Sequence, residues 1–217
     1  MAQTQNDSDQ YHDSTAKVLV LYYSCYGHTA TLAEGVAEGV GEMGAQVDVR
    51  RVPDTSDHNR TKAGVVPVIE MATLPAYDAI IVGSPTRYGR MAGPMASFFD
   101  KTGAIWASNA LVGKIGAAFT STGSQHGGQE TTLLGILINL MHFGMTIATV
   151  PYSEKRLTNL DEVSGGTPYG ASTVSAADGS RLPTANELAI AKWQGRHVAD
   201  LALSMVAGQT VRSKTVQ

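Results

Sequence analysis

Residues 17–29, KVLVLYYSCYGHT, place a short apolar run directly before a loop rich in hydroxyl groups. An apolar run of this length, made of Val, Leu and Tyr, is typical of a strand that is buried on both faces. Apolar residues with helical spacing follow over residues 28–44. The stretch therefore predicts a strand, a loop and a helix, which is the repeating unit of an α/β fold.

The same alternation continues along the chain. We expect further strands at residues 46–52, 78–84, 114–121 and 145–150, and further helices at residues 93–106, 129–143 and 184–207. The last helix has Thr184 as its expected N-cap, with Glu187 three residues later. Strands that alternate with helices predict one doubly wound parallel sheet of five strands, with helices on both faces.

The domain organisation follows from the absence of a repeat or a linker. We expect a single domain over residues 17–208, a disordered tail over residues 1–16 and a flexible tail over residues 209–217. The segments 53–76 and 151–183 are too long to be plain connections, which indicates function or mobility.

Composition excludes several classes of protein. A net charge of −3 and a pI of about 6.0 do not indicate nucleic-acid binding. A single cysteine rules out an internal disulfide. Residues 1–16 contain no apolar core of a signal peptide, so a cytoplasmic location is expected. The apolar stretch 133–150 is interrupted by Asn139, His142 and Gly144, which favours a buried helix and strand over a membrane span.

The first loop has the chemistry of a phosphate site. Ser24, Thr29 and Thr31 carry hydroxyl donors, Gly27 allows close approach of the backbone, and a helix N-terminus attracts anions. For this loop alone, an ordinary N-cap turn is the better interpretation. The missing G-x-x-x-x-G-K-[ST] sequence excludes a P-loop nucleotidase, and the lack of acidic residues at the strand ends argues against a phosphoacceptor receiver domain.

The sequence GVGEMG at residues 39–44 matches the dinucleotide pattern G-x-G-x-x-G in the wrong context, because it ends a helix and precedes a strand. We interpret these glycines as small residues for close packing and as a helix C-cap.

Two more loops leave the carboxyl ends of expected strands. They read SPTRYGRMAGP at residues 84–94 and STGSQHGGQE at residues 121–130. Glycines and backbone amides at a strand end can follow the edge of a flat heteroaromatic ring. Each loop alone could be a solvated connection, but three such loops at one edge of a sheet favour a phosphate plus a planar ring, as in FMN.

Four motifs together resemble the WrbA-type NAD(P)H:quinone oxidoreductases, which are flavodoxin-like FMN enzymes. The motifs are KVLVLYYSCYGHT, SPTRYGRMAGPMASFFDKTG-x-x-W, TSTGSQHGGQETT and GGTPYGAST, within a resemblance that runs from about Lys17 to about Gly208. The resemblance implies a sheet order of 2-1-3-4-5, bound FMN and two-electron reduction of quinones by ping-pong hydride transfer from NADH or NADPH. Segment 53–76 is shorter than usual in the family, and the family does not require a cysteine at position 25.

The resemblance also assigns residues to the cofactor. The implied FMN contacts are Ser24, Cys25, Tyr26, Gly27, His28 and Thr29 at the phosphate loop, Pro85, Thr86, Arg87 and Tyr88 in the second loop, Ser121, Thr122, Gly123, Ser124, Gln125 and Gly127 in the third, and His142. Tyr26 and Trp106 would face the nicotinamide or quinone. His142 would reach the flavin across a subunit boundary as a possible proton donor, in a homotetramer. No nucleophile and no metal are implied.

Other interpretations remain open at this point. Trp106 and His142 could be packing residues, and Arg87 could form a surface ion pair. A Cys25/His28 hydrolase lacks a third group to orient the histidine. A flavodoxin-like electron carrier without its own substrate turnover is the main functional alternative, although a net charge of −3 gives little support for an acidic docking face.

Overall fold

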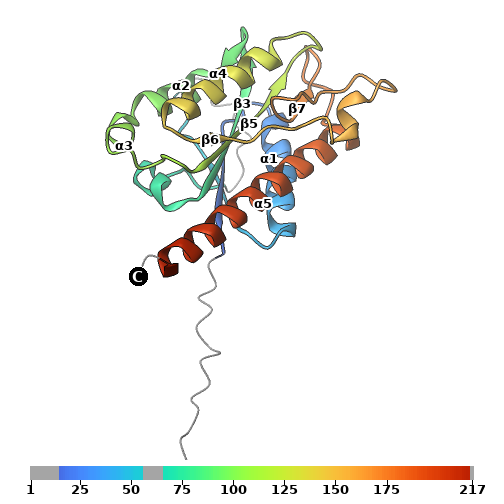
Figure 1. The fold of residues 1–217 in the computed structure, drawn as a ribbon. Helices are drawn as coiled ribbons and strands as arrows, with labels where there is room; N and C mark the ends of the chain where they lie inside the picture. The colour runs from blue at the N-terminus through green and yellow to red at the C-terminus, as the bar shows by residue number, and fades with distance from the viewer. Residues whose placement is uncertain (1–14, 56–65, 216–217) are drawn as a thin grey trace, which may run out of the picture.

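The fold is centred on a single sheet. The computed structural model describes residues 15–55 and 66–215, and Figure 1 shows the sheet between two layers of helices. The strands are β1 (Lys17–Tyr22), β2 (Gln46–Arg51), β3 (Ala79–Arg87), β4 (Arg90–Met91), β5 (Ile115–Thr122), β6 (Thr146–Ile147) and β7 (Ser172–Val174). The main path is β2-β1-β3-β5-β6, and all of its neighbours pair in parallel. This arrangement confirms the α/β fold and the parallel sheet.

The expected strand count of five is wrong, because the sheet has seven strands. The short strand β4 turns back to pair antiparallel with the end of β3, and β7 pairs in parallel with the end of β5. Both additions extend the sheet at the carboxyl edge of its central strands. The five strands of the main path lie in the expected order. Strands β5 and β6 take the places of the expected fourth and fifth strands, because β4 lies outside this path.

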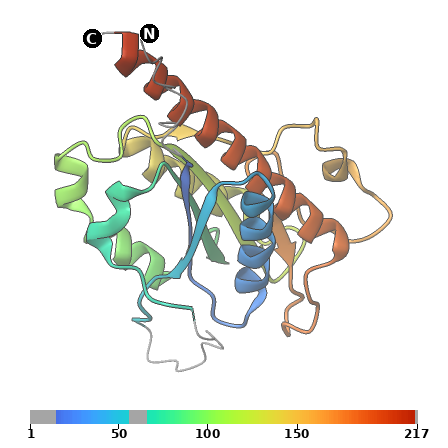
Figure 2. The same cartoon turned by 90° about the horizontal axis from the view of Figure 1, so that it is seen from below.

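Helices cover both faces of the sheet, as the sequence predicts (Figures 1 and 2). They are α1 (His28–Glu42), α2 (Gly93–Asp100), α3 (Gly103–Ala107), α4 (Gln129–His142) and α5 (Ala185–Thr215), with 3-10 turns at η1 (Met71–Ala76) and η2 (Lys155–Thr158). Helices α1 and α5 pack on one face, and α2 and α4 on the other. The strand β1 supplies both cores by alternation: Val18 and Val20 face α1 and α5, whereas Leu19 and Leu21 face the opposite layer.

The glycine pattern of residues 39–44 has the structural meaning expected for it. A Cβ on Gly39 would lie 2.0 Å from the Lys192 carbonyl oxygen, so α1 and α5 touch through backbone at this point. Gly195 makes the reciprocal approach, with 2.0 Å to the Val36 carbonyl oxygen. Gly44 follows the helix with φ of 78°, a left-handed conformation typical of a helix end.

Several predicted boundaries need correction. The single helix expected over residues 93–106 is broken between α2 and α3, where the Thr102 hydroxyl donates to the Phe99 carbonyl. The strand expected over residues 145–150 is confined to Thr146–Ile147. Residues 209–215, expected as part of a flexible tail, continue α5. Residues 1–14, 56–65 and 216–217 lie outside the described residues, and with them most of the expected N-terminal tail. Within the described ranges, no helix is both long and apolar enough to cross a membrane.

Strand β5 changes its neighbour halfway along its length. Its first residues pair with β6 and its last residues pair with β7. Between the two pairings, the buried Gln194 side chain of α5 donates to the Ala118 carbonyl at 2.9 Å and accepts from the Ala171 N–H at 3.0 Å. An amide side chain thus satisfies backbone groups at the fork between β6 and β7.

Candidate functional site

The N-terminus of α1 is open to a ligand. Gly27 is its N-cap with φ of 103°, no side chain caps the helix, and the first turn carries no acidic residue. The Ser24 hydroxyl accepts from the Gly27 N–H at 3.1 Å, which shapes the loop before the helix. The Thr31 hydroxyl donates back to the Gly27 carbonyl and does not line the pocket. The first N–H groups of α1 are therefore not consumed by a side-chain cap, unlike in an ordinary N-cap turn.

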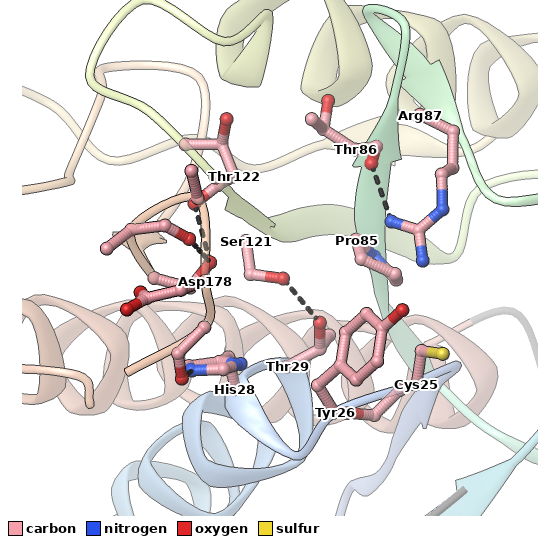
Figure 3. A pocket seen from close by; sticks show the side chains of 16 residues that line it. Cys25, Tyr26, His28, Thr29, Pro85, Thr86, Arg87, Ser121, Thr122 and Asp178 are labelled. Atoms are coloured by element: carbon pink, nitrogen blue, oxygen red, sulfur yellow. Dashed lines mark hydrogen bonds between the residues drawn. The ribbon is translucent and has the colours of Figure 1, made fainter. Parts of the chain in front are cut away.

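A cavity of about 540 Å³ lies over this helix end, at the carboxyl edge of the sheet. Its size is within the range of small-molecule sites. Figure 3 shows side chains from four separate segments converging on it. The lining residues are Ser24, Cys25, Tyr26, His28, Thr29, Pro85, Thr86, Arg87, Ser121, Thr122, Gly123, Ser175, Ala176, Ala177, Asp178 and Gly179.

All three loops predicted from the sequence contribute to the cavity. The hydroxyls of Thr29 and Ser121 form a buried hydrogen bond that joins the first loop to the third. The Thr86 hydroxyl bonds the Thr132 hydroxyl and the Gly128 carbonyl, which joins the second loop to the start of α4. The structure thus brings together eleven of the predicted cofactor residues as lining, within one continuous site.

The cavity has two chemically different sides (Figure 3). Arg87 lies on the side of Tyr26 and Cys25, and its guanidinium donates to the Thr86 carbonyl at 2.9 Å. His28 lies on the other side, next to Asp178. The Tyr26 ring stands at the mouth of the cavity with 56% of its surface exposed, which leaves an aromatic face available for stacking.

The fourth wall of the cavity, residues 175–179, was not among the predicted site residues. It belongs to the segment 151–183, whose excess length was the only signal in the sequence. The hydroxyl and N–H of Ser180 hold the pKa of the Asp178 carboxyl below its usual range, so Asp178 is ionised at neutral pH. The wall therefore adds one negative charge to the cavity.

Some predicted contacts do not line the cavity. Gly27 is the N-cap beneath it, and Tyr88 is fully exposed at the tip of the β3–β4 hairpin. The other predicted contacts in the third loop, Ser124, Gln125 and Gly127, form hydrogen bonds within the loop and with the start of α4. The Ser124 carbonyl accepts from the Thr122 hydroxyl and from the Gly127 N–H. The Gln125 carbonyl accepts from the Gln129 side chain.

Trp106 and His142 are neighbours, but they are distant from the cavity. The Trp106 indole donates to the His142 carbonyl at 2.9 Å. His142 is the last residue of α4, a helix of 14 residues that begins beside the cavity and is therefore about 20 Å long. Within one chain these two residues lie at the opposite edge of the sheet from the site.

The side chains do not form a cysteine–histidine dyad. His28 Nε2 lies 3.1 Å from the Gly179 carbonyl oxygen, which it can reach only as a donor. Cys25 is buried in the cavity wall, and no described hydrogen bond links it to His28. Instead, the chemistry of the site suits an anion at the α1 N-terminus and a flat ring between the ends of β3 and β5.

Comparisons with known proteins agree with this chemistry. The family described as NADPH-dependent FMN reductase matches residues 16–153. A protein of Gluconacetobacter diazotrophicus named NAD(P)H dehydrogenase (quinone) is 54% identical over 197 residues, covering 88% of this chain and 99% of its own length. A protein of the same name from Bradyrhizobium sp. is 55% identical over 192 residues, covering 86% and 96%.

Solved structures give the same fold. A flavodoxin, WrbA-like protein from Agrobacterium tumefaciens matches with a TM-score of 0.64 at 24% identity, covering 88% of this chain and 99% of that one. A flavodoxin from the domain Archaea matches with a TM-score of 0.59 at 27% identity, covering 86% and 98%.

Proposed function

The chain belongs to the NADPH-dependent FMN reductase family, and from this premise we propose that it is an FMN-dependent NAD(P)H:quinone oxidoreductase. The observation that carries the proposal is that one cavity joins all three strand-end loops above an uncapped helix N-terminus. Relatives that are 52–55% identical over most of the chain bear the name of this activity.

The residues present fit FMN. The α1 N-terminus offers free N–H groups, and no Cβ stands at Gly27 to block a phosphate. Ser24 and Thr29 add hydroxyls that can donate to phosphate oxygens. Pro85, Thr86 and the segment Ser121–Gly123 would hold the ribityl chain and the ring edge. The absence of a lysine at the phosphate loop matches recognition by backbone and hydroxyl groups.

When bound, FMN supplies hydride chemistry, and the protein supplies binding and orientation. Arg87 would place a positive charge beside the ring and stabilise negative charge there. Tyr26 would give the nicotinamide, and then the quinone, a flat surface that excludes water from the face of the ring. Two substrates that use one face in turn require the ping-pong order.

We further propose that the site is completed by other copies of the chain, in a homotetramer. Trp106 and His142 are not among the residues that line the cavity described above, and Trp106 exposes 55% of its surface. Leu134, Ile138 and Met141 form an exposed apolar stripe along α4, on the way to His142. Burial of this stripe by a second copy would favour assembly. The proposal keeps the single domain over residues 17–208 and the cytoplasmic location expected from the sequence.

One experiment separates the enzyme from an electron carrier without its own turnover. Purified protein is loaded with FMN and mixed anaerobically with NADH or NADPH, and a quinone is then added while the flavin absorbance is followed. We expect rapid bleaching by the nicotinamide and rapid recovery with the quinone. A protein that binds FMN but bleaches only with an auxiliary reductase would be a carrier, and one that binds no FMN would contradict the proposed function.

A further inference from the structure

Glu187 is a fully buried carboxylate with more partners than a helix cap requires. It forms the expected capping box with Thr184: its Oε2 accepts from the Thr184 N–H at 2.8 Å, and the Thr184 hydroxyl accepts from the Glu187 N–H at 3.3 Å. Its oxygens also accept from the Gly165 N–H at 2.7 Å, the Val174 N–H at 3.1 Å and the Thr173 hydroxyl at 2.8 Å. Most of its hydrogen bonds therefore hold β7 and its surroundings and not the helix.

Arg181 completes the group around Glu187. Its Nη1 lies 3.0 and 3.2 Å from the two carboxylate oxygens of Glu187. The same guanidinium donates to the carbonyls of Val174 and Val163, and the backbone N–H of Arg181 donates to the Ser175 carbonyl at 3.1 Å. Arg181 thus closes residues 175–181 into a loop at its base, directly after β7.

This loop carries the fourth wall of the cavity. At its start, the N–H and hydroxyl of Ser175 both donate to the Thr122 carbonyl, at 2.8 and 3.1 Å. Near its tip, the Gly179 carbonyl meets His28 at the N-terminus of α1. Ala176 has φ of 62°, a conformation that a residue with a side chain keeps only when its surroundings hold it.

We propose that Glu187 and Arg181 are positioning residues for the cofactor, which set the distance between the wall 175–179 and the N-terminus of α1. The inference rests on the proposed function, because it takes FMN to be the ligand. Neither residue lines the cavity, so each acts through the loop. Since the loop meets α1 at His28, its placement matters most for the phosphate-bearing end of the ligand.

A purely structural cap would behave differently. A capping glutamate needs to satisfy only the orphan N–H groups of its own helix, and glutamine serves in the same position. Glu187→Gln would retain that role, but it would remove the charge opposite Arg181 and replace one acceptor with a donor. Arg181, whose side chain is 24% exposed, would lose the countercharge that holds its guanidinium at the base of the loop. The substitution should therefore loosen the loop more than the helix.

The test measures dissociation constants for FMN and for riboflavin, which lacks the phosphate, by quenching of flavin fluorescence. For Glu187→Gln we expect FMN binding to weaken by about tenfold or more, and riboflavin binding by less than about threefold. Arg181→Lys keeps the charge but not the planar fork, so it should fold normally and show the same bias towards FMN.

Val198→Ala serves as the control for general destabilisation. Val198 is fully buried in α5, away from the loop, and its truncation should lower the unfolding temperature without changing the ratio of FMN to riboflavin affinity. If both Glu187→Gln and Arg181→Lys keep the wild-type FMN affinity, or weaken both flavins equally as a general loss of stability would, the inference is overturned. If wild-type protein binds no FMN, the proposed function falls and the inference with it.

Discussion

The hydroxyl groups of Thr29 and Ser121 lie 2.8 Å apart in a buried hydrogen bond, although 92 residues separate them in the chain. This bond joins the N-terminus of α1 to the end of β5 in the middle of the cavity. Replacing Thr29 by valine keeps the shape of the side chain and leaves the Ser121 hydroxyl unpaired.

We expect Thr29→Val to weaken FMN binding by about tenfold, because a lost hydrogen bond to a charged group costs about 1.5–3 kcal/mol. Isothermal titration with FMN measures the effect. Thr31→Val is the matched control, since its hydroxyl bonds the Gly27 carbonyl outside the cavity. Equal affinities of the two variants would contradict a role for the Thr29 hydroxyl in binding.

Arg87→Ala should also weaken FMN binding, because it removes the one guanidinium among the lining residues of the cavity. We expect a loss of about tenfold, which corresponds to one charge-assisted contact. Arg90→Ala removes the same kind of side chain from the same hairpin, where Arg90 donates to its neighbour Met91 and does not line the cavity. If the Arg87→Ala variant binds FMN as tightly as the Arg90→Ala variant, Arg87 does not contribute to FMN binding.

The distance of Trp106 from the cavity leads to a test by complementation. We expect Trp106→Ala and Tyr26→Ala each to lower kcat/KM for quinone by about tenfold, as loss of an aromatic contact would. When the two variants are unfolded and refolded together, mixed assemblies contain sites with both aromatic residues intact. Activity of the mixture above that of either variant refolded alone would support a shared site. Simple averaging of the two activities would place the function of Trp106 within its own chain.

Gly39 and Gly41 occupy the same helix but should respond in opposite ways to alanine. The new Cβ at position 39 would lie 2.0 Å from the Lys192 carbonyl oxygen, whereas position 41 has nothing within 4 Å. We expect Gly39→Ala to cost about 1–3 kcal/mol through overpacking, and Gly41→Ala to stabilise the helix by about 0.5–1 kcal/mol. Urea unfolding monitored by circular dichroism measures both. Equal stabilities would show that α1 and α5 separate easily.

The ion pair between Glu42 and Lys192 predicts a dependence of stability on pH. The hydrogen bond from Lys192 is the main cause that lowers the pKa of Glu42 below its ordinary value of 4.5. A carboxyl whose pKa is lower in the folded state contributes stability above its unfolded pKa and loses it as pH falls through the folded pKa. The unfolding temperature of wild-type protein should therefore exceed that of Glu42→Gln at neutral pH, and the difference should shrink below pH 4.5. Because the pair is at the surface, the difference should be small and should also shrink in about 1 M salt. A difference that grows on acidification would contradict this assignment.

The sequence predicts the parts of the fold that depend on local pattern. The apolar run KVLVLYY and the helical spacing after its loop predict a buried strand and the start of a helix where the structure has them. The three loops could be assigned to one edge because parallel strands end at the same edge of a sheet. The strands β4 and β7 could not be predicted, since two or three residues carry too little pattern to distinguish a strand from a loop.

The wall 175–179 was missed for a related reason. Its residues, Ser175 to Gly179, resemble any exposed turn, and their place at the cavity depends on Arg181 and Glu187. Glu187 could be recognised as a cap from its spacing to Thr184, but its partners Gly165, Thr173 and Val174 are 13 to 22 residues away in the chain. Contacts at such separations leave no periodic signal in a sequence.

The fork in β5 has a consequence for how this protein can change. Strand β6 pairs with the start of β5, at Ile115 and Gly116, and β7 pairs with its end, at Thr120 to Thr122. The strand that leads into the wall of the cavity is therefore β7 and not β6. Between the two pairings, the Gln194 side chain bonds the backbone of Ala118 and Ala171. Residues 176–179 can therefore differ in length and composition while the sheet stays intact, provided that Arg181 keeps its contacts with Glu187 and Val174. Because residues 175–179 line the cavity, a new loop grafted between Ser175 and Arg181 is a route to a changed ligand preference on an unaltered sheet.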